Sequence, residues 1–210
     1  MNEQIVILDF GSQYTQVIAR RIRECKVYSI IIHYNTPAAE IAKMNPSGII
    51  LSGGPSSVYA KAAPLPDESI FDLGVPVLGI CFGQQVLVRH LGGRGEPAPE
   101  REYGSARLDV AEAADPLLSE VPAQSTVWMS HGDRVESLPP RSSALAYTEN
   151  SPVAALEISE NIFGLQFHPE VNHTPLGSSI LENFLFRTCD CQATWTPGNF
   201  VTEAIARVRA

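Results

Sequence analysis

No apolar segment of this sequence approaches the roughly 18 to 20 residues that a membrane-spanning helix needs. The amino-terminal stretch MNEQIVILDF is short and has neither a preceding basic region nor a cleavage site, so it predicts a first β-strand rather than a signal peptide. Clusters of basic residues are also missing, and the formal net charge at pH 7 is -8. These absences argue against a membrane protein and against a nucleic-acid-binding protein, and they favour a cytoplasmic location.

Cysteine is scarce, with 4 residues in a chain of 210. A disulfide framework is not expected in a chain of this size without an export signal. Cys189 and Cys191 form a C-x-C pair, a spacing that suggests metal binding, but no second Cys or His pair with zinc spacing accompanies them. The sequence therefore predicts no metal site.

The hydrophobic content of 44% and the charged content of 18% are ordinary for a globular protein, and 210 residues suffice for one α/β domain with a full core. In the first half, apolar runs alternate with helical patterns. The expected strands are 5–10, 27–33, 48–54 and 75–81, and the expected helices are 13–25, a short one from Pro37, 67–74 and 83–93. This order predicts an α/β fold with an open, doubly wound, mostly parallel sheet flanked by helices.

Short strands separated by turn signals predominate in the second half, at 105–111, 126–130, 143–148, 152–158 and 162–168. They predict a small antiparallel annex, some of whose strands extend the main sheet. A last helix over 175–189 should pack back on that sheet. The domain is then expected to span residues 1–188, followed by a linker and the start of a helix over 189–210.

Cys81 lies in the stretch LGICFGQQ, residues 78–85, where a predicted strand ends and a helix begins. Open α/β sheets place their ligands at such junctions, and the N-terminus of a helix stabilises a negatively charged sulfur. Gly79 and Gly83 flank the cysteine, which permits a sharp turn and close packing. The pattern has the form of a nucleophile elbow with Cys in place of Ser. On this context alone, a catalytic thiol and a buried structural cysteine are equally supported.

The stretch FHPE, residues 167–170, favours catalysis. In an extended backbone His168 and Glu170 point to the same face, and Pro169 favours that extended form at His168. A carboxylate next to a histidine fixes the tautomer and the orientation of the imidazole base. Cys81, His168 and Glu170 are therefore predicted to form a complete triad.

Together, G-I-C-F-G-Q-Q and H-P-E resemble the class I (triad-type) glutamine amidotransferases, and the resemblance extends from ILDFGSQY to NFLF. In that family a cysteine attacks the side-chain amide of L-glutamine, ammonia leaves, and water hydrolyses the glutamyl thioester. The resemblance implies that Cys81 is the nucleophile, that His168 is the general acid–base, and that Glu170 orients His168.

Both tetrahedral intermediates of such a reaction carry an oxyanion that needs preorganised donors. One expected donor is the backbone N–H of Phe82, directly after the nucleophile. The resemblance assigns the other to Gly54 in LSGGP, residues 51–55. It assigns contacts with the substrate to Gly53, Gln85, Ser130, His131, Gly132 and Asp133, although His131 could also be an ordinary loop histidine. No cofactor is implied for this chain itself.

The stretch SGGPSS, residues 52–57, has a rival interpretation because it is superficially similar to the pyrophosphate-binding loop SGGxDSS of ATP pyrophosphatases. The Asp is missing, and Pro55 lacks an N–H donor that a phosphate cradle would use. The oxyanion-hole interpretation of this loop is therefore favoured.

Three stretches resemble one branch of the family, the glutaminase domains of GMP synthases: REYG at 101–104, WMSHGD at 128–133 and HPEVNHTPLG at 168–177. This resemblance implies an ATP pyrophosphatase (synthetase) domain of the same polypeptide, outside these 210 residues, that binds ATP and Mg and aminates XMP to GMP. It also implies a homodimer formed through those outside regions. Two alternatives remain open, a glutaminase of the anthranilate or carbamoyl-phosphate type and a non-catalytic interaction module of the same fold.

Overall fold

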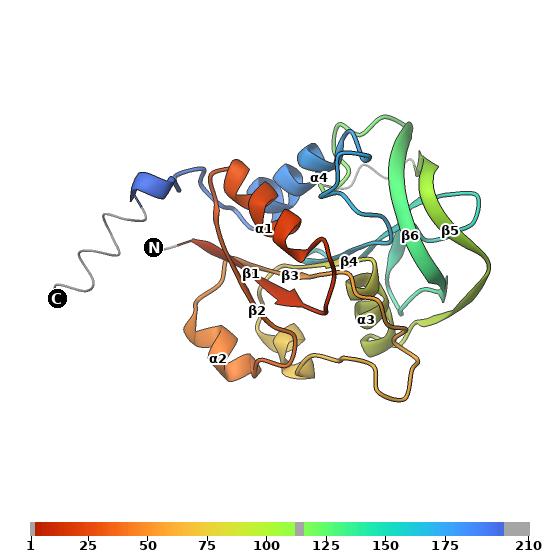
Figure 1. The fold of residues 1–210 in the computed structure, drawn as a ribbon, viewed down its shortest axis with the longest axis horizontal. Coiled ribbons are helices and arrows are strands. Elements are labelled where there is room, and N and C mark those ends of the chain that lie inside the picture. The colour runs from red at the N-terminus through yellow and green to blue at the C-terminus, as the bar shows by residue number, and fades with distance from the viewer. Residues whose placement is uncertain (1–2, 112–115, 200–210) are drawn as a thin grey trace.

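The computed structural model describes residues 3–111 and 116–199, and the strands in these ranges form one mixed sheet (Figure 1). Their order across the sheet is β2-β1-β3-β4-β9-β8-β7-β5-β6. The parallel part contains β2 (Tyr28–His33), β1 (Gln4–Asp9), β3 (Gly48–Leu51), β4 (Val77–Ile80) and β9 (Ile162–Leu165). These strands read as continuous apolar runs because helices cover both of their faces. The predicted doubly wound α/β fold is confirmed.

The antiparallel part continues this sheet beyond β9. It contains β8 (Ala155–Ser159), β7 (Ser143–Tyr147), β5 (Arg94–Val110) and β6 (Gln124–Ser137). The expected annex is therefore larger than predicted and is not separate from the main sheet. β5 and β6 have 17 and 14 residues, and they form a long curved ribbon at one end of the molecule (Figure 1). Their pairing shifts register between Pro97 and Glu102, which allows the ribbon to continue past the prolines.

Helices cover the two faces of the parallel part. Helices α1 (Thr15–Glu24) and α4 (Gly177–Asn183) lie on one face, and α2 (Ala38–Lys43) and α3 (Phe82–His90) lie on the other (Figure 1). The helix predicted over 67–74 is a short 3₁₀ helix, η1 (Glu68–Asp72), on the second face. None of the helices in the described ranges has both the length and the apolarity needed to cross a membrane.

Alternate residues of each strand face opposite layers. Ile5 and Ile7 of β1 pack in the core beneath α1 and α4, whereas Val6 and Leu8 pack in the core beneath α2 and α3. This alternation follows from the period of two residues in a β-strand.

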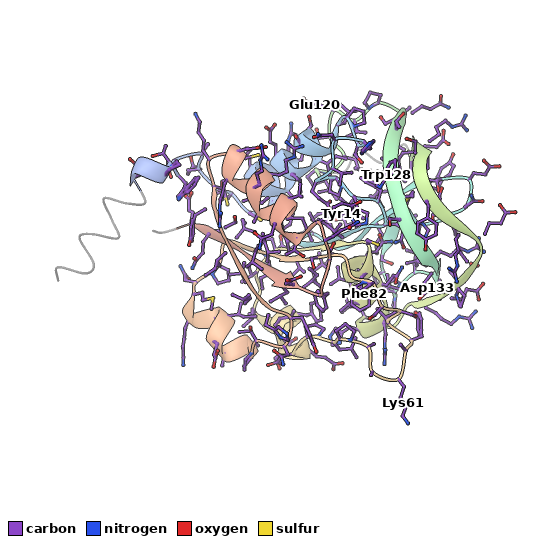
Figure 2. All side chains as sticks on the ribbon, viewed as in Figure 1. Tyr14, Lys61, Phe82, Glu120, Trp128 and Asp133 are labelled. Atoms are coloured by element: carbon purple, nitrogen blue, oxygen red, sulfur yellow. The ribbon has the colours of Figure 1, made fainter. Side chains whose placement is uncertain are left out.

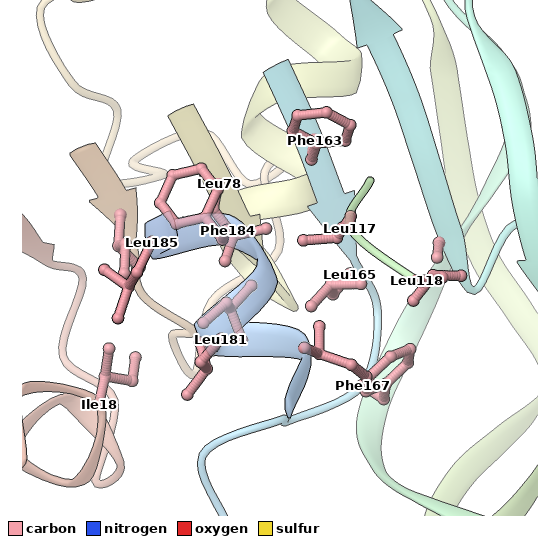
Figure 3. Close-up of a cluster of buried hydrophobic side chains, with 14 of the residues drawn as sticks. Ile18, Leu78, Leu117, Leu118, Phe163, Leu165, Phe167, Leu181, Phe184 and Leu185 are labelled. Atoms are coloured by element: carbon pink, nitrogen blue, oxygen red, sulfur yellow. The ribbon is translucent and has the colours of Figure 1, made fainter. Parts of the chain in front are cut away.

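Helix α4 continues into a π-helical turn, η2 (Phe184–Thr188), and together they seal the first core. Figure 3 shows Leu181, Phe184 and Leu185 directed at Leu78 of β4 and at the side chains of β9. Since β4 and β9 carry the two halves of the candidate site, this packing also supports the site.

The chain after η2 runs back along the first helical layer. Cys191 is buried, and the backbone N–H of Trp195 donates to the Lys26 carbonyl at 2.8 Å. The amphipathic helix predicted near the end of the sequence lies mostly in residues 200–210, outside the described residues.

Phe184→Ala should lower the free energy of unfolding of this chain by about 3–5 kcal/mol, because it removes a fully buried aromatic ring and leaves a cavity. Urea denaturation measures this loss. Phe186→Ala is the matched control, because Phe186 is only half buried against the same core. Equal losses in the two variants would contradict the assignment of Phe184 to the centre of the core.

Candidate active site

Cys81 occupies a sharp turn between β4 and α3. Its backbone dihedrals are φ 52° and ψ -105°, a conformation that residues other than glycine rarely adopt. A Cβ at Gly79 would lie 2.6 Å from the Gly83 carbonyl oxygen, and a Cβ at Gly83 would clash with the Leu51 carbonyl oxygen. Both glycines are therefore required for the close approach of the helix to β3 and β4. Backbone strain of this kind, which the surrounding packing maintains, is typical of functional positions.

The Cys81 sulfur is nearly enclosed, with 5% of the residue exposed. The thiol donates to the Ser130 carbonyl at 3.7 Å, and the Gln166 side-chain amide donates to the sulfur at 3.8 Å. The first turn of α3 begins directly after Cys81, so the positive end of the helix dipole stabilises negative charge on the sulfur. These contacts hold the sulfur in place at the start of α3.

His168 and Glu170 form the second half of the site. The Glu170 Oε1 atom lies 2.7 Å from His168 Nδ1, and both side chains are buried. Burial lowers the pKa of His168. Together, the negative charge of Glu170, the hydrogen bonds with Cys81 and Glu170 and the charge of Cys81 outweigh this largest single effect, and they raise this pKa well above its usual value. The His168 side chain thus lies between Glu170, at its Nδ1 atom, and Cys81, with which it also forms a hydrogen bond.

Of the two expected oxyanion donors, Phe82 directly follows Cys81, and Gly54 lines the same pocket. The Gln85 N–H makes the first hydrogen bond of α3, to the Cys81 carbonyl at 3.3 Å, so the Phe82 N–H belongs to the first turn, whose N–H groups have no partner within the helix. The Phe82 ring packs on Phe10, with centroids 5.4 Å apart, and only its backbone is available for chemistry. A Cβ at Gly54 would lie 2.9 Å from the Phe10 carbonyl oxygen.

A pocket of ≈ 550 Å³ opens above Cys81. Figure 2 labels Tyr14, Phe82 and Asp133, which reach this pocket from the loop after β1, from α3 and from β6. Most of the predicted site residues line it: Gly54, Cys81, Phe82, Gln85, Ser130, His131, Gly132, Asp133 and His168. Two predicted residues lie behind it. Glu170 is buried behind His168, and Gly53 lies against the His168 ring, where a Cβ would be 3.1 Å from Cε1.

Two of the predicted substrate contacts have internal hydrogen bonds. His131 Nδ1 lies 2.9 Å from the Asp133 carbonyl, and His131 Nε2 lies 3.2 Å from Glu102. The Gln85 amide donates to the Asp133 carbonyl at 3.0 Å and to Gln166 at 3.3 Å. His131 therefore acts within the wall of the pocket, and Gln85 has its oxygen available to accept from a ligand.

Sequence reasoning missed three residues of the site. Gln166 contacts the Cys81 sulfur, the Tyr14 ring meets the His168 ring edge-on at 5.1 Å, and Arg21 donates to the Glu170 carbonyl at 3.0 Å. A signal existed for Gln166, because the side chains of residues 166, 168 and 170 point to the same face of an extended backbone. A weaker signal existed for Tyr14, which follows the carboxyl end of the first strand. Arg21 lies on a helix face that only the tertiary structure places beside Glu170.

Within residues 3–111 and 116–199, no group of three or more His, Cys, Asp or Glu side chains is arranged to hold a metal ion. The polar groups at the pocket are instead a thiol, an imidazole–carboxylate pair and backbone donors. This set of groups supports acyl transfer through a covalent thioester.

The comparison with protein families matches residues 6–188 to "Glutamine amidotransferase class-I". A protein named "GMP synthase [glutamine-hydrolyzing]" from Dehalococcoides mccartyi is 54% identical over 209 residues, which cover 100% of this chain and 39% of that protein. A protein of the same name from Nostoc sp. is 51% identical over 207 residues, covering 98% of this chain and 38% of that protein. The chain thus spans about two-fifths of the length of these relatives.

Solved structures show the same fold. A putative GMP synthase subunit from Thermoplasma acidophilum superposes with a TM-score of 0.82 at 28% identity, covering 90% of this chain and 95% of that one. A glutamine amidotransferase from Thermotoga maritima superposes with a TM-score of 0.71 at 18% identity, covering 91% and 100% of the two chains. The second likeness concerns the fold alone.

Glu170→Gln should lower the pKa of His168, because it removes the negative charge that raises this pKa. A ¹⁵N NMR titration of the His168 ring measures the change, and the expected midpoint lies at lower pH than in the unmodified protein. Glu160→Gln, an exposed carboxylate elsewhere, is the control and should leave the midpoint in place. A midpoint that stays constant or rises in Glu170→Gln would refute the role of the Glu170 charge.

Proposed function

The chain belongs to the class I glutamine amidotransferase family, and we propose from this premise that its site hydrolyses L-glutamine to glutamate and ammonia through a thioester on Cys81. The observation that carries the proposal is the arrangement of Cys81 at the N-terminus of α3, facing His168, with Glu170 at 2.7 Å behind it. Nucleophile, base and orienting carboxylate are the three parts that covalent acyl transfer requires.

The reaction proceeds in two halves. His168 accepts the proton of the Cys81 thiol, the sulfur attacks the side-chain carbonyl carbon of glutamine, and the backbone N–H groups of Phe82 and Gly54 stabilise the oxyanion. His168 gives this proton to the leaving nitrogen, and ammonia departs. His168 then takes a proton from water, which attacks the thioester; the C–S bond breaks, glutamate is released, and His168 returns the proton to the Cys81 sulfur. Each oxyanion donor of this kind is worth on the order of 10² to 10³ in rate.

The pocket wall supplies the groups that would recognise the rest of the substrate. The Gln85 oxygen accepts from the amide of the ligand, because the hydrogens of its own amide are used by Asp133 and Gln166. The Asp133 Oδ2 atom is buried without a hydrogen-bond partner. This carboxylate suits the α-amino group of an amino acid, and Gly132 lets the ligand approach the backbone of the same segment.

We further propose that the ammonia is used by a synthetase domain of the same polypeptide, which binds ATP and Mg and aminates XMP to GMP. Support comes from the relatives named GMP synthase, which are 51% and 54% identical to this chain and extend well beyond it. A homodimer formed by that larger protein belongs to the same proposal. A cytoplasmic location is proposed too, because a nucleophilic thiol must stay reduced and all four cysteines are free.

Cys81→Ala should abolish glutamine hydrolysis, because no thioester can form without the thiol. Release of glutamate measures this loss, and circular dichroism checks that the fold persists. In the full-length protein, amination of XMP with added ammonia should continue, because that route bypasses the thioester. Cys25→Ala is the matched control, since Cys25 lies outside the pocket. Residual hydrolysis in Cys81→Ala would show that the mechanism is wrong.

Glutamine hydrolysis by residues 1–210 alone should be slow, and in the full-length protein it should increase when ATP and XMP bind, because release of ammonia without an acceptor wastes glutamine. The test is a steady-state glutaminase assay of both proteins with and without the nucleotides. Equal turnover under all conditions would exclude this coupling. Stimulation by the substrates of an anthranilate or carbamoyl-phosphate synthase instead of XMP would assign the chain to a different branch.

A further inference from the structure

A buried polar cluster lies behind the pocket wall, outside the triad. It contains Glu102 of β5, His131 of β6, and Thr148 and Ser151 of the loop between β7 and β8, and each of these residues is less than 9% exposed. The Glu102 carboxylate accepts from the Thr148 hydroxyl at 2.9 Å and from the Ser151 hydroxyl at 3.1 Å, and its Oε2 atom lies 3.2 Å from His131 Nε2. Burying a carboxylate is costly unless it is fully hydrogen-bonded, so the cluster requires an explanation.

The hydrogen bonds of His131 place a hydrogen on Nδ1 and fix the orientation of the ring. Nδ1 lies 2.9 Å from the Asp133 carbonyl oxygen, which can only accept, so Nδ1 carries a hydrogen. Nε2 lies between the Glu102 carboxylate and the Ser151 hydroxyl, at 3.2 Å from each. Burial raises the pKa of Glu102, but the hydrogen bonds from His131, Thr148 and Ser151 outweigh this effect and hold the pKa below its usual value. An ionised Glu102 thus fixes the ring from behind.

The fixed ring acts on the substrate pocket through one backbone oxygen. The Asp133 carbonyl accepts from His131 Nδ1 and also from the Gln85 amide at 3.0 Å. The second hydrogen of Gln85 is donated to Gln166 at 3.3 Å. The position of the Asp133 carbonyl therefore decides where Gln85 holds its oxygen, the atom available to a ligand. The carbonyl of Ser130, directly before His131, accepts a hydrogen bond from the Cys81 thiol.

We propose that Glu102 is a positioning residue for glutamine binding, which acts through His131 on the Asp133 carbonyl and hence on Gln85. This proposal rests on the proposed function of the site. Glu102 itself does not line the glutamine pocket, and its hydrogen bonds lead to Gln85 through His131 and the Asp133 carbonyl. Its loss should therefore weaken substrate binding and leave the chemical steps largely intact.

The test compares Glu102→Leu with Glu102→Gln in the full-length protein. Leucine removes the acceptor of Thr148 and Ser151 and the partner of His131 Nε2. Glutamine keeps the shape, and its amide can donate to Nε2, which preserves the hydrogen on Nδ1. The matched control is Glu100→Gln, which makes the same change at an exposed carboxylate two residues away on β5.

In Glu102→Leu the KM for glutamine should rise about tenfold or more, with kcat within about threefold of the unmodified value. Glu102→Gln should keep KM within about threefold of the unmodified value, while Glu100→Gln has no effect. Alkylation of Cys81 by iodoacetamide, which does not use the pocket contacts, should be unchanged in all variants. Alkylation by diazo-oxo-norleucine, which resembles glutamine, should slow in Glu102→Leu alone.

Two results would overturn the positioning role. One is an unchanged KM in Glu102→Leu. The other is a general loss, in which iodoacetamide labelling and thermal stability change together with KM and Glu102→Gln gives no rescue, since this would show a structural role only. Both differ from failure of the proposed function, in which the unmodified protein would neither hydrolyse glutamine nor react with diazo-oxo-norleucine at Cys81.

Discussion

The turn at Cys81 is the constraint on which the rest of the site depends. A positive φ at a cysteine is unfavourable, and it persists only because the backbone of α3 is packed against β3 and β4 at Gly79, Gly83 and Leu51. This packing places the sulfur at the end of a helix dipole and directs the next N–H to the same point. Parallel pairing of β4 with β9 then brings His168 to the sulfur, because both residues follow the carboxyl ends of neighbouring strands. The proposed nucleophile, oxyanion donor and base thus all depend on this single backbone arrangement.

Much of the fold could be predicted from the sequence, because the strands of a doubly wound sheet are short apolar runs and the helices between them have their own period. The first strand, the first helix and the Cys81 junction all follow from local patterns. The ribbon of β5 and β6 was only partly predicted. Pro97 and Pro99 interrupt the strand pattern, and the register shift that accommodates them is a property of the pairing, not of either segment alone.

The triad could be predicted because its signals are local. Cys81 has glycines at fixed spacing, and His168 and Glu170 are separated by one proline. The hydrogen-bonded residues that surround these three could not be predicted in the same way. Glu102 and His131 are 29 residues apart, and Gln85 and Gln166 are 81 residues apart. Their contacts exist only after the strands have paired. The sequence indicates the proposed reacting groups well. It does not indicate the hydrogen bonds that fix their positions.

The place of β9 in the sheet has a consequence for biosynthesis. This strand is the last one along the described part of the chain, yet it inserts between β4 and β8 in the interior of the sheet. Until residues 162–165 leave the ribosome, the β4 edge has no neighbour on that side and is open to mispairing with other chains. Because His168 and Glu170 follow β9, the side chains of the candidate site come together only once β9 has joined the sheet beside β4.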